Sequence, residues 1–319
     1  MPLSRLDSLR ANIDPILSGL AQGISNEAFV SELLLPTVDV ESRTGQFPEF
    51  GKENMRVHDA QRALKDPLVK NVPIDDWTFQ EYGLKEYGLE MSIDHLEQEA
   101  ASQIANLEQF AMSQVMQSLL LTQEYERVQL LSASGSYASG HVSALTGDDC
   151  WDDSDSAPLT QIKDAISTIR TKTAQYPNTL ILGLQSFNAL SEHASLIEKL
   201  KYSQMAVVTE DLISAMISTK TNKINVAVGA GMYEDAITKV MTDLWGDVAV
   251  LAYVPPTKRA QRNKYESSFG YTFGMRGYPI GARDVSKYGL TTSVAAFLMF
   301  QAKITKNTAG YLWTNTKGS

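Results

Sequence analysis

The sequence predicts a mixed α+β fold with a long helix in one part of the chain and an α/β lobe in another. Residues 89–134 contain neither Gly nor Pro and are rich in Leu, Ala, Gln, Glu and Met. This composition favours helix, because straight-chain side chains lose little rotamer freedom there. Segments of strand and helix character alternate over 159–254, and a β-rich segment follows at 269–313. A single helix over 94–131 would span roughly 57 Å at about 1.5 Å per residue.

Composition and charge exclude several classes of protein. The 319 residues are 43% hydrophobic and 20% charged, as in ordinary folded chains, so extensive disorder is not expected. The net charge of −9 argues against a general grip on nucleic acid, which needs clustered positive charge. The single cysteine, Cys150, excludes an intrachain disulfide and indicates a reducing compartment. The first twenty residues are too polar for a signal peptide, and no apolar run is long enough to span a membrane.

The first ninety residues contain no obvious core of their own. Residues 1–45 are predicted as short helical pieces followed by an extended stretch at 37–40. Residues 46–91 are predicted as a long two-stranded excursion, with an outgoing arm at 47–57 and a return at 77–84. A hairpin of this length is marginal in isolation, so we expect it to lie on a neighbouring subunit.

The predicted long helix has a start signal and an apolar stripe. Asp94 followed by Glu97 is similar to a capping box, with Asp in place of Ser or Thr. Apolar residues then recur every three or four positions, which predicts one buried face against the C-terminal strands. The residues of this stripe are Leu96, Ala100, Ile104, Leu107, Ala111, Val115 and Leu119.

After a loop region rich in Ser, Gly and Asp, the pattern predicts an α/β lobe. Helices are expected at 159–173, 186–193, 196–202 and 209–217, and strands at 179–182, 224–228 and 248–254. The last segment, 269–313, is expected to return the chain to the lobe of the long helix.

No catalytic or metal-binding motif stands out. Residues 45–52 lack the spacing of a phosphate loop, and 229–231 lack the third glycine of a dinucleotide turn. The four histidines are scattered without metal-ligand spacing. Five aspartates within 148–155 indicate either a solvated loop or a site that attracts a hard cation. Four basic residues within 258–264 indicate a solvated loop, an intersubunit salt-bridge face or a nucleic-acid patch. We expect no enzyme activity, no cofactor and no metal.

Taken in order, these segments resemble the tailed-bacteriophage major capsid proteins, whose fold is named after phage Hong Kong 97. The resemblance covers about residues 27 to 275 and rests on several short motifs rather than on one. These are FPEFGKENMR at 47–56, PNTLILG at 177–183, EKLKY at 198–202, VTEDL at 208–212, DLWGD at 243–247, AYVPP at 252–256 and SFGYTF at 268–273.

The resemblance implies a domain organisation for this chain. It assigns 1–45 to an N-terminal arm and 46–91 to an extended β-hairpin loop. The long helix becomes the spine of a peripheral domain formed by 92–158 and 257–319. Residues 159–256 become an α/β axial domain that faces the centre of the capsomer.

The resemblance also implies contacts between subunits through the extended loop. The residues expected there are Phe47, Phe50, Lys52, Arg56, Arg62, Trp77 and Phe79. Some relatives cross-link a lysine of this loop to a neighbouring asparagine. Because nothing around Lys52, Lys65 or Lys70 singles one out, we expect no cross-link here.

The implied function is a structural one. Copies of the chain would form hexamers and pentamers of an icosahedral head that encloses double-stranded DNA without sequence-specific binding. The implied partners are a scaffolding protein, a portal and a decoration protein, with assembly in the host cytoplasm and no membrane. An arm of about 45 residues is too short for the scaffolding extension fused to some relatives. The alternatives are an encapsulin-type nanocompartment shell and, from another class, a cytosolic α/β enzyme built on 159–256.

Overall fold

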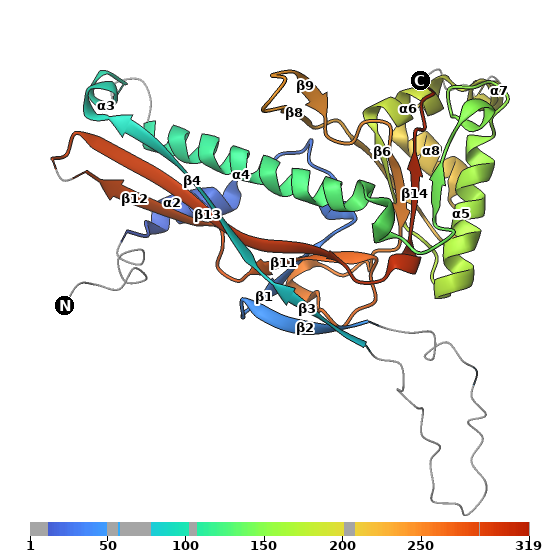
Figure 1. Ribbon diagram of the computed structural model, residues 1–319, viewed down its shortest axis with the longest axis horizontal. Coiled ribbons are helices and arrows are strands. Elements are labelled where there is room, and N and C mark those ends of the chain that lie inside the picture. Colours follow the sequence, from blue (N-terminus) through green and yellow to red (C-terminus); the bar gives the residue numbers. More distant parts are fainter. Residues whose placement is uncertain are drawn as a thin grey trace, which may run out of the picture.

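The computed structural model describes residues 12–49, 57, 78–101, 107–200, 208–286 and 288–318. These residues form two lobes, each built on a five-stranded sheet (Figure 1). One lobe is elongated and carries the longest helix, whereas the other is a compact α/β lobe. The predicted α+β class is confirmed.

The strand β13 (Thr291–Ile304) is the centre of the sheet in the elongated lobe. It pairs antiparallel with β4 (Lys85–Asp94) on one side, and with β12 (Ile280–Val285) and β11 (Gly270–Met275) on the other. β1 (Thr37–Val40) extends this sheet by parallel pairing with β11. Because neighbouring residues of a strand point to opposite faces, β13 can supply side chains to a separate core on each face.

One face of β13 is covered by α4 (Leu107–Ser132). Ala111, Val115 and Leu119 are buried against the sheet, so the predicted stripe is confirmed over this part of the helix. Their partners on β13 are Val294, Ala296, Leu298 and Phe300. The 26 residues of α4 span about 39 Å at about 1.5 Å per residue.

The prediction of a single helix over 94–131 is wrong. α3 (His95–Ala101) is a separate element, and Gln98 Nε2 donates to Glu108 Oε1 across 3.2 Å. Ten residues of continuous helix would separate these positions by about 15 Å, beyond the reach of the two side chains. Leu96, expected in the buried stripe, is 64% exposed. Asp94 does mark a helix start, since its Oδ1 accepts from the Leu96 amide at 2.9 Å.

The N-terminal region packs on other segments of its own subunit. α2 (Pro15–Gly23) begins with Asp14, whose carboxylate accepts from two amides of the first turn. Leu17 and Ala21 of α2 enter the core between α4 and β13. After the 3-10 turn η1 (Ser31–Leu33), the predicted extended stretch is present as β1.

The two arms of the predicted excursion pair with each other at its base, but residues 85–91, which were assigned to it, are part of β4 in the elongated sheet. β2 (Thr44–Glu49) and β3 (Thr78–Gly83) pair antiparallel, from Thr44 opposite Gly83 to Glu49 opposite Thr78. Together they cover the face of the elongated sheet that α4 leaves free (Figure 1). We call β2 and β3 the stem.

The α/β lobe is built on a mixed sheet in the order β5-β14-β10-β6-β7. Its strands are β5 (Val142–Ala144), β6 (Thr179–Gly183), β7 (Asn225–Gly229), β10 (Ala249–Ala252) and β14 (Gly310–Thr314). One face carries four helices, α5 (Pro158–Thr173), α6 (Leu184–Glu192), α7 (Ala194–Leu200) and α8 (Glu210–Ile217). The four helices and the strands β6, β7 and β10 lie where the sequence predicts them.

The other face of the α/β sheet joins the two lobes. Ile181, Val250 and Leu312 contact the C-terminal turns of α4 and the segment Leu34–Leu35 that precedes β1. The two lobes therefore share one continuous interior.

The last strand does not follow the prediction that 269–313 returns to the lobe of the long helix. β11, β12 and β13 do so, but β14 pairs with β10 inside the α/β sheet. β5, within the segment assigned to the first part of the peripheral domain, pairs with β14. Both strands therefore belong to the α/β lobe by hydrogen bonding.

Candidate assembly surfaces

The stem is anchored to its own subunit by aromatic side chains. Phe47 and Tyr82 both contact Phe273 of β11, with ring centroids 5.2 Å and 4.6 Å away. Phe47 is fully buried in this cluster, so its side chain has no area left for a neighbouring subunit. The expected intersubunit contact therefore does not fit Phe47, which instead fixes the direction of the stem.

Phe79 is the described candidate that remains free. It stands opposite Pro48 in the stem and is 57% exposed. The other five expected contact residues lie outside the described residues, as do all three lysines considered for a cross-link and the turn of the excursion. They are Phe50, Lys52, Arg56, Arg62 and Trp77, with Lys65 and Lys70.

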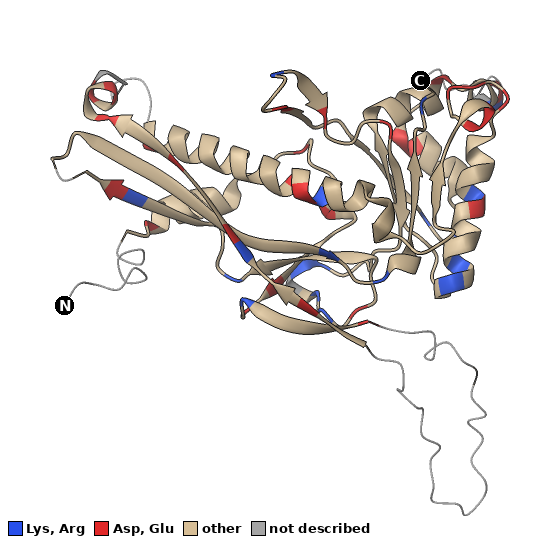
Figure 2. Ribbon diagram, viewed as in Figure 1, with Lys and Arg blue, Asp and Glu red and all other residues tan. Residues whose placement is uncertain are grey.

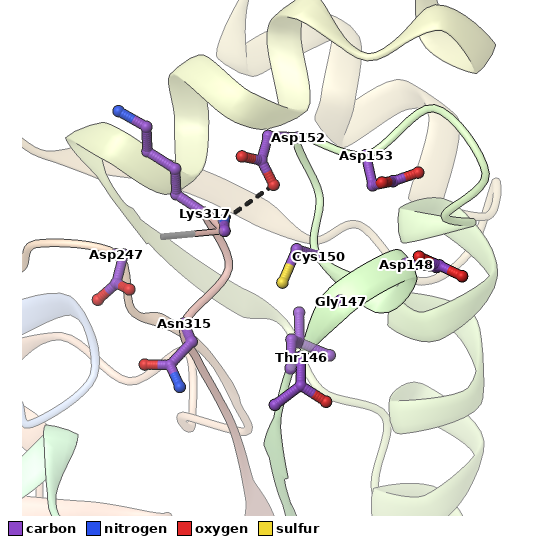
Figure 3. Close-up of a pocket in the computed structure, with 11 residues that line it drawn as sticks. Thr146, Gly147, Asp148, Cys150, Asp152, Asp153, Asp247, Asn315 and Lys317 are labelled. Atoms are coloured by element: carbon purple, nitrogen blue, oxygen red, sulfur yellow. Dashed lines mark hydrogen bonds between the residues drawn. The ribbon is translucent and has the colours of Figure 1, made fainter.

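The stretch of five aspartates contributes to an open depression of about 680 Å³. Asp148, Asp152 and Asp153 line it, with Asp247 and Asn315 opposite (Figure 3). These side chains are spread around the rim rather than aimed at one point. Within the described ranges, no group of three or more His, Cys, Asp or Glu side chains is arranged to hold a metal ion.

Cys150 and His193, whose side chain types are often reactive, have structural roles here. Burial and then the nearby aspartates raise the pKa of the Cys150 thiol, which makes it less reactive. His193 Nδ1 accepts from the Ser195 amide at 3.2 Å, and Nε2 lies 3.0 Å from the Asp153 carbonyl. These bonds tie the acidic loop to the start of α7.

The basic segment 258–264 is partly neutralised within the subunit. Arg259 Nη2 forms an ion pair with Asp39 Oδ1 of β1 at 2.9 Å, and Arg262 Nε donates to the Thr257 carbonyl. The ammonium group of Lys264 lies 5.4 Å from the Tyr265 ring centroid. Figure 2 shows basic and acidic residues interspersed over both lobes in this view, rather than one basic band.

A buried pair of charges on α4 was not predicted. The carboxylate of Glu124 accepts from the amide of Ser31 at 3.0 Å and from its hydroxyl. Arg127 donates to the hydroxyls of Thr37 and Thr272. Burial lowers the pKa of Arg127, and the charges of Glu32 and Glu124 oppose that shift. The pair therefore attaches the N-terminal region to α4. The sequence signal for this pair is its spacing. Glu124 and Arg127 are three residues apart, on the helix face that also buries Val128 and Leu131.

A second feature missed by the sequence patterns is a small hairpin formed by β8 (Met232–Glu234) and β9 (Met241–Asp243). It projects beside α4 in Figure 1 and carries several exposed apolar side chains.

Among the described residues, no helix is both long enough and apolar enough to cross a membrane.

Known proteins resemble the whole chain. No protein-family model matches it. The major capsid protein of Burkholderia phage BcepMu is 35% identical over 317 residues, which cover 99% of this chain and 100% of that protein. A phage-related protein of Bordetella bronchiseptica superposes with a TM-score of 0.79 at 25% identity, over 96% of this chain and 98% of that one. The capsid of cyanophage P-SCSP1u superposes with a TM-score of 0.57 at 10% identity, over 93% and 90%.

The full-length relative separates the shell alternatives. A nanocompartment shell would share the fold, but the protein that is 35% identical from end to end is a phage capsid protein. A cytosolic enzyme is excluded by the same relationship. The chain therefore belongs to the major capsid proteins of tailed phages, structural subunits with the Hong Kong 97-like fold that form the icosahedral head of the virion.

Proposed function

We propose that the extended loop, residues 46–91, is the principal arm by which each subunit holds its neighbour in the shell. The observation that supports this is the division of roles within the stem. Phe47 and Tyr82 lock the stem to its own subunit, whereas Phe79 leaves more than half of its surface open to a partner. A rigid base with an exposed aromatic residue is typical of an interface anchor, because little order is lost on binding.

The sharpest test compares two phenylalanines of the same stem. Phe79→Ser is expected to leave the urea unfolding midpoint of the free subunit unchanged and to reduce the yield of shells in sedimentation and negative-stain microscopy. Phe47→Ser is expected to lower the midpoint itself, because it empties a buried site. Shells at full yield from Phe79→Ser, and from a variant with 50–77 replaced by a short Gly-Ser turn, would contradict the proposal.

We further propose that the shell is built from hexamers and pentamers, with the elongated lobe as the peripheral domain and the α/β lobe as the axial domain. Neighbours are held without covalent bonds between them. Denatured shells should then run as single subunits on gels, and a ladder of higher species would contradict this. Image classification of purified shells would test the two kinds of capsomer.

We propose that the shell encloses double-stranded DNA without binding it tightly. The support is the net charge of −9 and the interspersed acidic and basic residues in the view of Figure 2. Free subunits should show little affinity for duplex DNA at low salt, and a steep salt-dependent affinity would contradict this. A scaffolding protein, a portal and a decoration protein are the further proposed partners. Co-expression with the scaffolding protein should convert irregular assemblies into shells of one size.

A further inference from the structure

The hairpin β8–β9 has a shape that its own hydrogen bonds fix. Oδ1 of Asp235 accepts from the amides of Ile237 and Thr238 at 2.9 Å and 2.8 Å, and the Asp235 amide donates to the Val240 carbonyl at 3.0 Å. These backbone bonds lower the pKa of Asp235, so its carboxylate stays ionised and keeps closing the turn. The turn is therefore already ordered before any partner binds.

One face of this hairpin packs on α4, and the apolar side chains of the other face are exposed. Tyr233 contacts Tyr125 of α4, with ring centroids 5.1 Å apart. Met232 and Met241 lie on the opposite face, because they flank the Tyr233–Thr242 pair by one position on each strand. They are 45% and 57% exposed, and Ile237 at the tip is 92% exposed.

An ordered loop that presents apolar side chains is typical of a binding site rather than of a solvated turn. Methionine adapts its shape to a partner, and a preordered anchor loses little entropy on binding. Two acids lie beside the methionines: Glu234, in an exposed ion pair with Lys239 at 3.6 Å, and Asp243, which accepts from Gln185 Nε2 at 3.1 Å. With Asp235 at the turn, the hairpin carries three acids against one lysine and is acidic on balance. We call the free face and tip of β8–β9, with Glu234 and Asp243, the hairpin surface.

A surface of complementary chemistry lies on the other side of the elongated sheet. The segment 257–266 contains Lys258, which is exposed, and Lys264 beside Tyr265, which is 52% exposed. Its Arg259 is paired to β1, and at its end the Glu266 carbonyl accepts from the Tyr271 hydroxyl of β11 at 3.2 Å. We call Lys258, Lys264 and Tyr265 the basic surface.

The two surfaces cannot meet within one chain. The hairpin contacts α4, which covers one face of the elongated sheet, whereas the segment 257–266 reaches Tyr271 on the face that the stem covers. Complementary patches on opposite sides of one subunit produce head-to-tail contacts, and such contacts close into rings when the rotation allows.

We propose that the hairpin surface of each subunit docks on the basic surface of the next subunit around the capsomer. The apolar tip meets Tyr265, while Glu234 and Asp243 face Lys258 and Lys264. This deepens the self-assembly described above and rests on the proposed ring-shaped capsomers. It is a contact separate from the extended loop.

Charge reversal on each surface tests the proposal. Variant A carries Glu234→Lys and Asp243→Lys, and variant B carries Lys258→Glu and Lys264→Glu. Each alone opposes like charges at the contact, so we expect its shell yield to fall roughly tenfold or more relative to the unmodified chain. A 1:1 co-expression of A and B should restore hexameric rings, because alternating subunits then oppose unlike charges at every contact of an even-numbered ring. A pentamer has an odd number of subunits and keeps at least one like-charge contact, so the readout of this mixture is the yield of hexamers rather than of complete shells.

Controls separate this contact from folding and from assembly in general. Glu210→Lys and Lys220→Glu reverse exposed charges elsewhere on the α/β lobe and should assemble normally. Far-UV circular dichroism and urea unfolding verify that A and B fold. Ile237→Asp, which leaves the turn bonds in place, should also lower the yield. If folded A, B and Ile237→Asp assemble at full yield, or if mixing A with B restores nothing, the proposed docking is refuted. If the unmodified chain forms no rings or shells under the same conditions, it is the proposed capsomer assembly that fails.

Discussion

Removing the hydroxyl of Ser31 should loosen the attachment of the N-terminal region to α4. In the structure, the Glu124 carboxylate is 2% exposed and accepts from the Ser31 amide, the Ser31 hydroxyl and, at 3.4 Å, the Trp245 indole. Ser31→Ala removes one hydrogen bond to a buried charge, which is worth about 1.5–3 kcal/mol. Trp245 and the Ser31 amide remain as donors, so a value at the lower end of that range is expected.

Glu124→Gln acts on the same network from the other side. It keeps the size of the side chain but removes the negative charge that helps to compensate the buried guanidinium of Arg127. We expect the free energy of unfolding to fall by roughly 3 kcal/mol, because the hydrogen bonds to a neutral amide are weaker and the buried guanidinium of Arg127 is less well compensated. The double variant should lose less than the sum of the two single variants, with a coupling of about 1 kcal/mol.

Urea unfolding of the unassembled subunit gives these free energies, and hydrogen exchange shows where the loosening occurs. The amides of Leu34 and Leu35, which donate to the Ser31 carbonyl, should exchange faster in Ser31→Ala. Ser118→Ala is the matched control, since its hydroxyl only bonds the Gln114 carbonyl on an exposed turn of the same helix. Unchanged stability and exchange in Ser31→Ala, together with no coupling to Glu124→Gln, would refute the role of this network.

Three further predictions concern the two cores and alkaline pH. Met112→Ala should lower the free energy of unfolding by about 2–5 kcal/mol, because Met112 is fully buried between α4 and β13. Gly183→Ala should cost about 1–3 kcal/mol in the same urea assay, since its Cβ would meet the carbonyl oxygen of Gly246 at 2.2 Å. Burial raises the pKa of Tyr137 well above 10.0, and its hydroxyl donates to the Leu131 carbonyl at 2.6 Å. Its contribution to stability is therefore complete below about pH 10 and is lost as the pH rises through the folded-state pKa. Tyr137→Phe should flatten the fall in unfolding free energy above pH 10; an unchanged slope would contradict this assignment.

Local patterns predict most of the individual elements. The spacing of apolar residues locates the C-terminal end of α4, the helices α5 to α8 and the strands β6, β7 and β10 within a few residues. This works because a helix or strand that buries one face must repeat apolar residues at its own period. The stem was also predictable, since its two arms flank the excursion whose turn region contains two prolines.

The candidate surfaces were less predictable, because exposure depends on what else covers a residue. Phe47 and Phe79 are both aromatic residues of the stem, yet one is buried against Phe273 and the other is open. The hairpin surface has no motif at all, and its two methionines share a face only because β8 and β9 pair in one register.

By itself, the sequence determined that this chain is an α+β protein whose ordered segments resemble a phage capsid subunit, because periodicity and local motifs are properties of neighbouring residues. The tertiary structure alone decided that the long helix is interrupted before α4, that the N-terminal region attaches to Glu124 and Arg127, and that β14 completes the α/β sheet. Each of these depends on contacts between residues far apart in the chain, such as Ser31 with Glu124. The free energy of those contacts overrides what the local pattern favours.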